Sequence, residues 1–204
     1  MAKILIFGAG SMGTAFSFPC SDKNHSVTII GTHLENDFID QINLKRVHPA
    51  LNCDIPKNVK LLKFDKLSEE INKKIDLIVI AVISKGIEWA SIELSKVLKN
   101  NTPILILTKG LAINNNNYEI LAYKMERLMK KNGIKETNIS AAGGPCLARG
   151  LANKIHTSVV FANTDIKIAK QISHLVSTDY YHVFTSDDVV GVETCAAIKN
   201  IFSM

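Results

Sequence analysis

A glycine-rich turn near the start of the chain is the clearest chemical signal in the sequence. Gly8, Gly10 and Gly13 are spaced as G-x-G-x-x-G, directly after the apolar run 3–7 and before a helical pattern. In this context the first glycine permits a tight turn, the second lets the backbone approach a pyrophosphate, and the third lets helix and strand pack closely. The start of the helix then offers free N–H groups to the phosphates. The pattern predicts a dinucleotide site.

The choice between NAD and NADP is usually set at the end of the second strand, where a carboxylate binds the ribose hydroxyls of NAD. Gly31-Thr32-His33 stands at this place, with Glu35 two residues beyond. It offers neither a carboxylate to repel a 2′-phosphate nor an arginine to clamp one. Thr32 and His33 could contact either cofactor, so the sequence predicts NAD or NADP.

Three later segments carry groups that could act on a substrate. Lys109 follows the apolar run 103–107, which would place it at the ligand-binding edge of a parallel sheet, although a solvated loop lysine is the simpler alternative. The loop at Gly144 and Cys146 allows close approach of a ligand, and Cys146 is expected to line a pocket rather than act as a nucleophile. Lys199 follows an apolar helical stretch, where a buried amine suits proton transfer and an amine that snorkels outward does not.

The elements that must position these groups follow from the hydrophobic pattern. Expected strands cover residues 3–7, 27–31, 59–62, 76–82, 103–107, 139–142, 157–162 and 181–184. The first expected helix begins at Ser11. The other expected helices cover residues 34–46, 86–99, 118–131, 165–176 and 187–204. Their alternation predicts an α/β fold with a doubly wound, mostly parallel sheet of the Rossmann type. Pro19 should kink or shorten the first helix, and the polar run 114–117 is expected to be a loop that caps a later one.

Composition narrows the class of protein. The 204 residues are 47% hydrophobic and 21% charged, which is typical of a globular α/β chain. The net charge of +5 comes without a basic run interleaved with aromatics, so no nucleic-acid partner is expected. Four cysteines lie far apart without a C-x-x-C pattern, so no metal site is predicted. No signal peptide or stretch of ~20 apolar residues is present, so we expect a cytoplasmic protein without a membrane span.

The four segments together resemble the NAD(P)-dependent glycerol-3-phosphate dehydrogenase family. The matching stretches are 8–15, 108–111, 144–148 and 191–200, in the family's order and at about its spacing. The resemblance implies an oxidoreductase that interconverts dihydroxyacetone phosphate and sn-glycerol 3-phosphate by hydride transfer with NAD(P)H. Such an enzyme takes a small phosphorylated three-carbon substrate and supplies the glycerol phosphate of phospholipids. The resemblance also implies that the full-length protein could form a homodimer.

The resemblance also implies roles for individual residues. Residues on the cofactor would be Ser11, Met12, Thr32, His33, Lys109 and Ala148, together with Gly8, Gly10 and Gly13 of the turn. Residues on the substrate would be Lys109, Gly144, Cys146 and Lys199, with Lys199 as the general acid/base. Two positions depart from the family pattern. Position 12 is Met in this chain and is often aromatic in the family, and position 146 is Cys in this chain and is commonly Ser or Thr in the family.

The family continues into a mostly helical second domain that supplies an acidic residue and an Arg-Asn pair for the substrate phosphate. We therefore expect a dinucleotide-binding domain over residues 1–185 and the first helix of a truncated substrate domain over 186–204. Two alternatives stay open. The chain could be a catalytically inactive dinucleotide-binding module, or part of a related two-domain reductase acting on hydroxyacyl-CoA or ketopantoate, which uses other catalytic residues.

Overall fold

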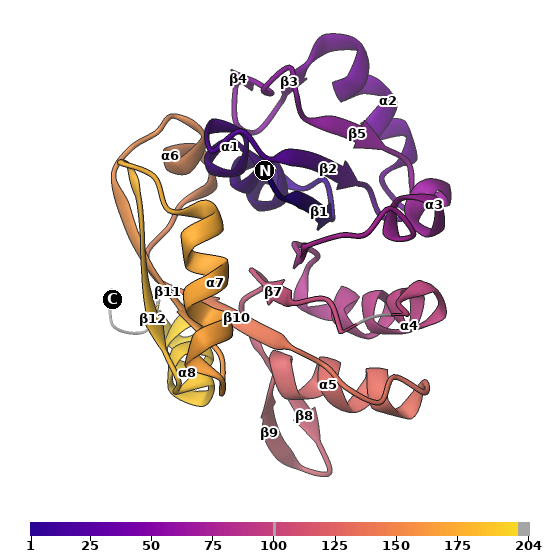
Figure 1. Cartoon of the computed structure of the whole chain (residues 1–204), viewed down its shortest axis with the longest axis vertical. Coiled ribbons are helices and arrows are strands. Elements are labelled where there is room, and N and C mark those ends of the chain that lie inside the picture. The colour runs from indigo at the N-terminus through magenta and orange to yellow at the C-terminus, as the bar shows by residue number, and fades with distance from the viewer. Residues whose placement is uncertain (100, 200–204) are drawn as a thin grey trace.

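One eight-stranded sheet forms the centre of the computed structural model, which describes residues 1–99 and 101–199 (Figure 1). Its strands are β1 (Lys3–Phe7), β2 (Ser26–Ile30), β5 (Lys60–Leu62), β6 (Leu77–Ile80), β7 (Ile104–Ile106), β10 (Ile139–Gly143), β11 (Thr157–Ala162) and β12 (Tyr181–Ser186). They lie in the order β12-β11-β10-β7-β6-β1-β2-β5, and all neighbours are parallel except β10 and β11. The predicted doubly wound, mostly parallel sheet is confirmed.

Helices cover both faces of this sheet. The first face packs against α1 (Ser11–Asp22), α2 (Asn36–Lys45), α6 (Ala148–Ala152) and α7 (Ile166–Val176). The second packs against α3 (Leu67–Ile71), α4 (Ile87–Val97), α5 (Leu121–Lys131) and α8 (Val189–Ile198). Short 3-10 turns at Phe64–Lys66 and Ser84–Gly86 lead into α3 and α4.

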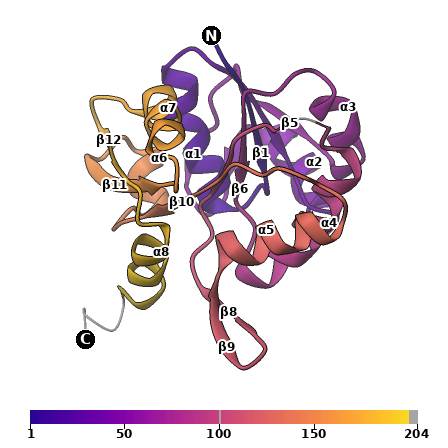
Figure 2. The same ribbon diagram turned by 60° about the horizontal axis from the view of Figure 1, so that its bottom comes forward.

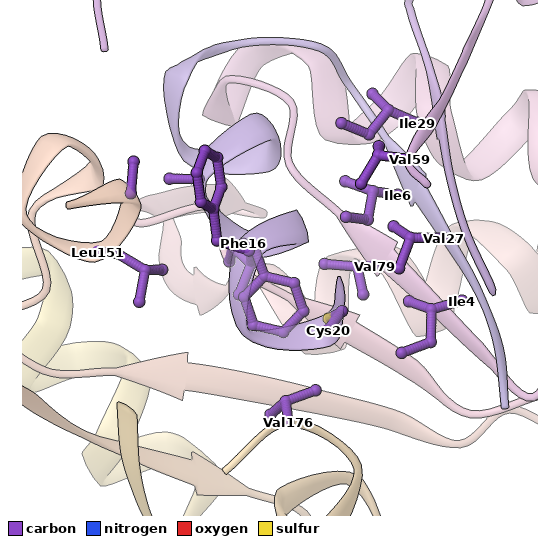
Figure 3. Close-up of a cluster of buried hydrophobic side chains, with 14 of the residues drawn as sticks. Ile4, Ile6, Phe16, Cys20, Val27, Ile29, Val59, Val79, Leu151 and Val176 are labelled. Carbon is purple, nitrogen blue, oxygen red and sulfur yellow. The ribbon is translucent and has the colours of Figure 1, made fainter. Parts of the chain in front are cut away.

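Side-chain alternation explains why the strands read as continuous apolar runs. In β1, Ile4 and Ile6 pack into the cluster on the first face, whereas Leu5 and Phe7 pack into the cluster on the second. Figure 3 shows the first cluster, in which Phe16 of α1 lies among side chains of the sheet and of neighbouring helices. In a strand that is buried on both faces, successive side chains are therefore all apolar.

Of the two effects expected of Pro19, a kink or a shorter first helix, the shorter helix is wrong. The helix does not end at Pro19, but runs on to Asp22, and the N–H of Lys23 still donates to the carbonyl oxygen of Pro19 at 3.1 Å. Proline removes one backbone donor and crowds the preceding turn. Because α1 is buried along nearly its whole length by the sheet and its neighbouring helices, packing holds these residues helical.

The polar run 114–117 forms a hairpin turn. The sequence had indicated that it caps the next helix, and this prediction is wrong. The run joins β8 (Leu111–Asn114) to β9 (Asn117–Ile120), and Figure 2 shows the hairpin projecting from the body of the protein. Asn115 and Asn116 have φ of 49° and 62°, which a two-residue hairpin turn requires and asparagine tolerates. The next helix, α5, begins only at Leu121 and has no side-chain cap. A second small hairpin, β3 (Val47–His48) with β4 (Cys53–Asp54), was also not predicted.

The last predicted helix is found as α8, and its expected continuation over 200–204 lies outside the described residues. The other predicted elements agree with the observed ones to within a few residues at their ends. Among the described residues, no helix is long and apolar enough to cross a membrane.

His25 ties together three segments on the amino-terminal side of the sheet. Its Nδ1 accepts the N–H of Ala2 at 3.1 Å, and its Nε2 lies 2.8 Å from the carbonyl oxygen of Leu175. These partners require a neutral ring that carries its proton on Nε2. Burial lowers the pKa of His25 below 6.5, although the bond to Leu175 opposes this shift.

We expect His25→Ala to remove an acid-dependent loss of stability. Because the folded pKa lies below the unfolded value, the unfolded chain binds more protons as pH falls through 6.5, and stability is lost there. At pH 8 the variant should be about 1–2 kcal/mol less stable, since one buried and one partly buried hydrogen bond are lost. Urea denaturation of both proteins at pH 8 and pH 5 measures this. The difference between them should shrink at pH 5, and an equal difference at both pH values would contradict the prediction.

Candidate functional site

The glycine-rich turn joins β1 to α1 at the carboxyl edge of the parallel strands. Gly8 has φ of +115°, and a Cβ there would lie 2.7 Å from the carbonyl oxygen of Ala81. A Cβ on Gly13 would collide with the carbonyl oxygen of Gly8. A Cβ on Gly10, in contrast, would meet nothing within 4 Å. The first and third glycines are therefore required by packing, while the middle one leaves open space for a ligand.

The amino end of α1 is free to meet an anion. Gly10 is the N-cap residue and has no side chain, so no side-chain hydrogen bond caps the helix. The first turn, which includes Ser11, Met12 and Gly13, also contains no acidic residue. Its N–H groups and the positive end of the helix dipole together favour a phosphate.

Glu35 reaches back to this turn. Its Oε2 accepts the N–H of Thr32 at 2.7 Å and the N–H of Ala9 at 3.2 Å. No carboxylate stands at the end of the second strand in the sequence, and the structure shows that the side chain of Glu35 brings one there. The T-x-x-E spacing from Thr32 to Glu35 is a helix-start pattern that could have indicated it.

A cavity of about 470 Å³ opens beside the turn. It is lined by residues of the turn and of the two neighbouring βα loops: Gly8, Gly10, Thr32, His33, Leu34, Glu35, Ala81, Val82, Ile83, Lys85, Gly86 and Trp89. The Trp89 ring lies 4.5 Å from the His33 ring and 5.1 Å from the Phe64 ring, centroid to centroid. The lining of the cavity therefore combines the Trp89 and His33 rings with glycines of the turn.

Lys109, Gly144 and Lys199 meet at the same edge of the sheet. The Lys109 Nζ donates to the carbonyl oxygen of Gly144 at 2.9 Å. Burial lowers the pKa of Lys109, and the nearby positive charge of Lys199 lowers it further. Gly144 and Lys199 also line a second cavity of about 450 Å³ between the β10 loop and α8. Two ammonium groups held close together make a site for an anion.

Cys146 lies beneath this site rather than on its surface. Its side chain is buried, and burial raises the pKa of its thiol despite the nearby charges of Lys109 and Lys199. A thiol kept protonated is a poor nucleophile. That Cys146 lines a substrate pocket and is not a nucleophile stays a prediction.

The chain matches a family model over residues 3–169. That model describes the NAD-dependent glycerol-3-phosphate dehydrogenase N-terminus, and the match covers most of the chain. The chain belongs to this family. The resemblance predicted from the four sequence segments is thereby confirmed.

Individual relatives of this dehydrogenase family agree. The chain is 30% identical over 207 residues to the glycerol-3-phosphate dehydrogenase [NAD(P)+] of Oceanobacillus iheyensis, covering 100% of the chain and 57% of that protein. It is 28% identical over 201 residues to the NADP(+)-dependent glycerol-3-phosphate dehydrogenase of Archaeoglobus fulgidus, covering 98% of the chain and 58% of that protein. The chain thus spans little more than half the length of these relatives.

A solved structure supports the fold. The glycerol-3-phosphate dehydrogenase of Coxiella burnetii superposes with a TM-score of 0.84 at 24% identity, over 99% of the chain and 59% of that structure. The Rossmann-type arrangement of this family member is therefore shared with a dehydrogenase of known structure.

Two further residues that were predicted to contact the cofactor lie away from the cavity at the turn. Met12 of α1 and Ala148 of α6 are half-buried and pack against the same hydrophobic cluster. Neither lines the cavity at Trp89. Their predicted contacts with a cofactor stay predictions.

Two residues that line the cavity at the turn were missed in the sequence, as was one buried contact outside the two cavities. Lys85 and Trp89 line the cavity at the turn, and Glu193 of α8 accepts the N–H of Ala122 at 2.9 Å in a buried position. The spacing of Lys85 and Trp89 after the strand ending at Ile80 could have indicated them, since ligands gather at that edge. Nothing in the sequence pairs Glu193 with Ala122, which is 71 positions away.

Proposed function

We propose that the full-length protein is an NAD(P)-dependent glycerol-3-phosphate dehydrogenase that interconverts dihydroxyacetone phosphate and sn-glycerol 3-phosphate. Its product would supply the glycerol phosphate of phospholipids. The observation that carries the proposal is the meeting of Lys109 and Lys199 at the sheet edge that also bears the glycine-rich turn. Two cations there suit a phosphorylated substrate, whereas the related hydroxyacyl-CoA reductases use other catalytic groups.

The cofactor would be held by the turn and the cavity beside it. The open space at Gly10 and the uncapped start of α1 suit the pyrophosphate. Thr32, His33 and Trp89 line the cavity that would take the adenosine end. When bound, the reduced nicotinamide supplies the hydride. Thr32 and His33 suit either cofactor, and the Oε2 of Glu35 already accepts two backbone N–H groups, so both NAD and NADP stay candidates.

Lys199 would act as the general acid in the reducing direction. Its ammonium donates a proton to the carbonyl oxygen of the substrate as that carbon is reduced, and stabilises the developing alkoxide until the proton is transferred. Lys109 would face the substrate with its ammonium, oriented by the Gly144 carbonyl oxygen. An anionic substrate also offsets the repulsion between the two ammonium groups.

The test is the oxidation of NADH or NADPH by the full-length protein in the presence of dihydroxyacetone phosphate. Lys199→Ala should lower kcat by 10²-fold or more, about the range of general acid catalysis, and leave cofactor affinity within about twofold. Lys131→Ala, an exposed lysine at the end of α5, is the matched control and should change neither. Absence of turnover with both cofactors, or full turnover in Lys199→Ala, would refute the proposal.

Calorimetry of the 204-residue chain addresses the alternative of an inactive binding module. Cofactor binding without turnover would favour the module for this chain, and turnover would exclude it. The domain division stays a prediction, with a dinucleotide-binding domain over residues 1–185 and the start of a substrate domain over 186–204. A homodimer and a cytoplasmic location also stay predictions for the full-length protein.

A further inference from the structure

Two histidines lie side by side at the outer edge of the sheet. His156 immediately precedes β11, and His182 is the second residue of β12, the edge strand. The Nδ1 of His156 lies 3.2 Å from the Nε2 of His182, and the ring centroids are 5.4 Å apart. Both side chains are exposed. Within residues 1–99 and 101–199, neither histidine lines the cavity at the glycine-rich turn or the one beside Lys199.

The backbone holds the two histidines at a fixed separation. Thr157 and Tyr181, which follow and precede them, pair in the parallel ladder, and the N–H of Thr157 donates to the carbonyl oxygen of Tyr180 at 2.9 Å. The Tyr181 side chain is buried in the core on the opposite face of the strand. The pair is therefore set by the fold and not by the mobility of a loop.

The separation of the two nitrogens matches the bite of a metal ion. With metal–nitrogen bonds of about 2.0–2.1 Å, two nitrogens 3.2 Å apart subtend roughly 100° at the metal. This angle lies between the octahedral and tetrahedral values. We propose that His156 and His182 form a chelating site for a divalent transition-metal ion that favours imidazole, such as Ni²⁺, Cu²⁺ or Zn²⁺.

Binding needs no net release of protons from a neutral pair. In the observed arrangement one ring donates and the other accepts, so one of the facing nitrogens carries a proton. Moving that proton to the other nitrogen of the same ring frees both facing lone pairs for the metal. Because both rings are exposed, they can rotate toward a common ion and exchange the proton with water.

The protein supplies two ligands. No group of three or more His, Cys, Asp or Glu side chains gathers as a metal site in the part of the chain that the structure describes. The remaining coordination positions are therefore filled by water or by a donor from another molecule. Such a site binds its ion more weakly than a closed structural zinc centre with four protein ligands.

Titration with Ni²⁺ by calorimetry tests the proposal. Cys195 is exposed and its thiol could also bind metal, so all proteins compared carry Cys195→Ser. The chain with both histidines should bind one Ni²⁺ ion, and His156→Ala and His182→Ala should each weaken binding at least tenfold. His174→Ala, an exposed histidine on α7, should stay within twofold. Ni²⁺ should also raise the Tm only where both histidines are present.

Two results would overturn the site. Affinity within twofold of the parent in either His156→Ala or His182→Ala would show that one ring, or another part of the chain, holds the ion. Absence of Ni²⁺ binding to the parent would show that the pair is only a hydrogen bond. Melting curves without metal confirm that each variant is folded, which is expected because both side chains lie at the surface.

Discussion

Gly13→Ala should destabilise the protein by about 2–3 kcal/mol or more, whereas Gly10→Ala, at the N-cap of α1, should cost no more than about 1 kcal/mol. A Cβ at position 13 collides with the backbone oxygen of Gly8 and comes within 2.9 Å of the Ala81 Cβ, so helix and strand must separate. Gly10 has φ of −63° and open space around its Cα, which alanine accepts without strain. Urea denaturation of the three proteins at one pH measures the difference.

The same pair of variants separates folding from binding. In Gly10→Ala the added methyl occupies the space proposed for the pyrophosphate, so NADH and NADPH should bind at least tenfold more weakly although the protein is folded. Calorimetry with each cofactor gives the affinities. Normal cofactor binding by Gly10→Ala would contradict the placement of the pyrophosphate, and equal stability of Gly13→Ala and the wild type would contradict the packing role of Gly13.

Glu193→Gln should make the protein more stable above pH 7. The carboxyl group of Glu193 in α8 is buried, and it accepts the N–H of Ala122 at the start of α5. Burial raises its pKa from 4.5 to about 7, although the bond to Ala122 opposes this shift. Ionising this group in the folded protein therefore costs free energy that a neutral amide does not pay.

The direction of the pH dependence follows from the pKa of Glu193, which is 4.5 in the unfolded chain and about 7 in the folded protein. Between pH 4.5 and about 7 the folded protein binds more protons at Glu193 than the unfolded chain does, so its contribution to stability is lost as pH rises through this window. A shift of this size corresponds to about 3 kcal/mol at pH 8. Glu193→Gln should therefore match the wild type near pH 4.5 and exceed it by up to that amount at pH 8.

Denaturation of Glu193→Gln and wild type from pH 4.5 to pH 8 checks this expectation. Glu136→Gln, which alters an exposed glutamate, is the matched control and should follow the wild type throughout. A stability difference that does not change with pH would contradict the ionisation of Glu193 in this window. His25 acts with the opposite sign over part of the range, so the comparison uses differences between variant and wild type.

The sequence by itself predicted most strands and helices of the main sheet and the glycine-rich turn. The apolar runs of β1 and β6 are local in the chain, and burial on both faces leaves a pattern that can be read directly. The spacing of Gly8, Gly10 and Gly13 is equally local, because one turn must satisfy all three constraints. The family resemblance followed from such short segments in the correct order.

Only the tertiary structure decided which distant groups meet. Lys109 and the Gly144 carbonyl oxygen are 35 positions apart, and His25 and Leu175 are 150 positions apart. Hydrophobic periodicity records whether a residue is buried, but not which residue it faces or whether neighbouring strands run parallel, as the antiparallel join of β10 and β11 illustrates. The position of the Glu35 carboxylate could not be predicted for the same reason. It accepts the N–H of Ala9 in the glycine-rich turn, and this contact forms only when the loop between β2 and α2 is packed.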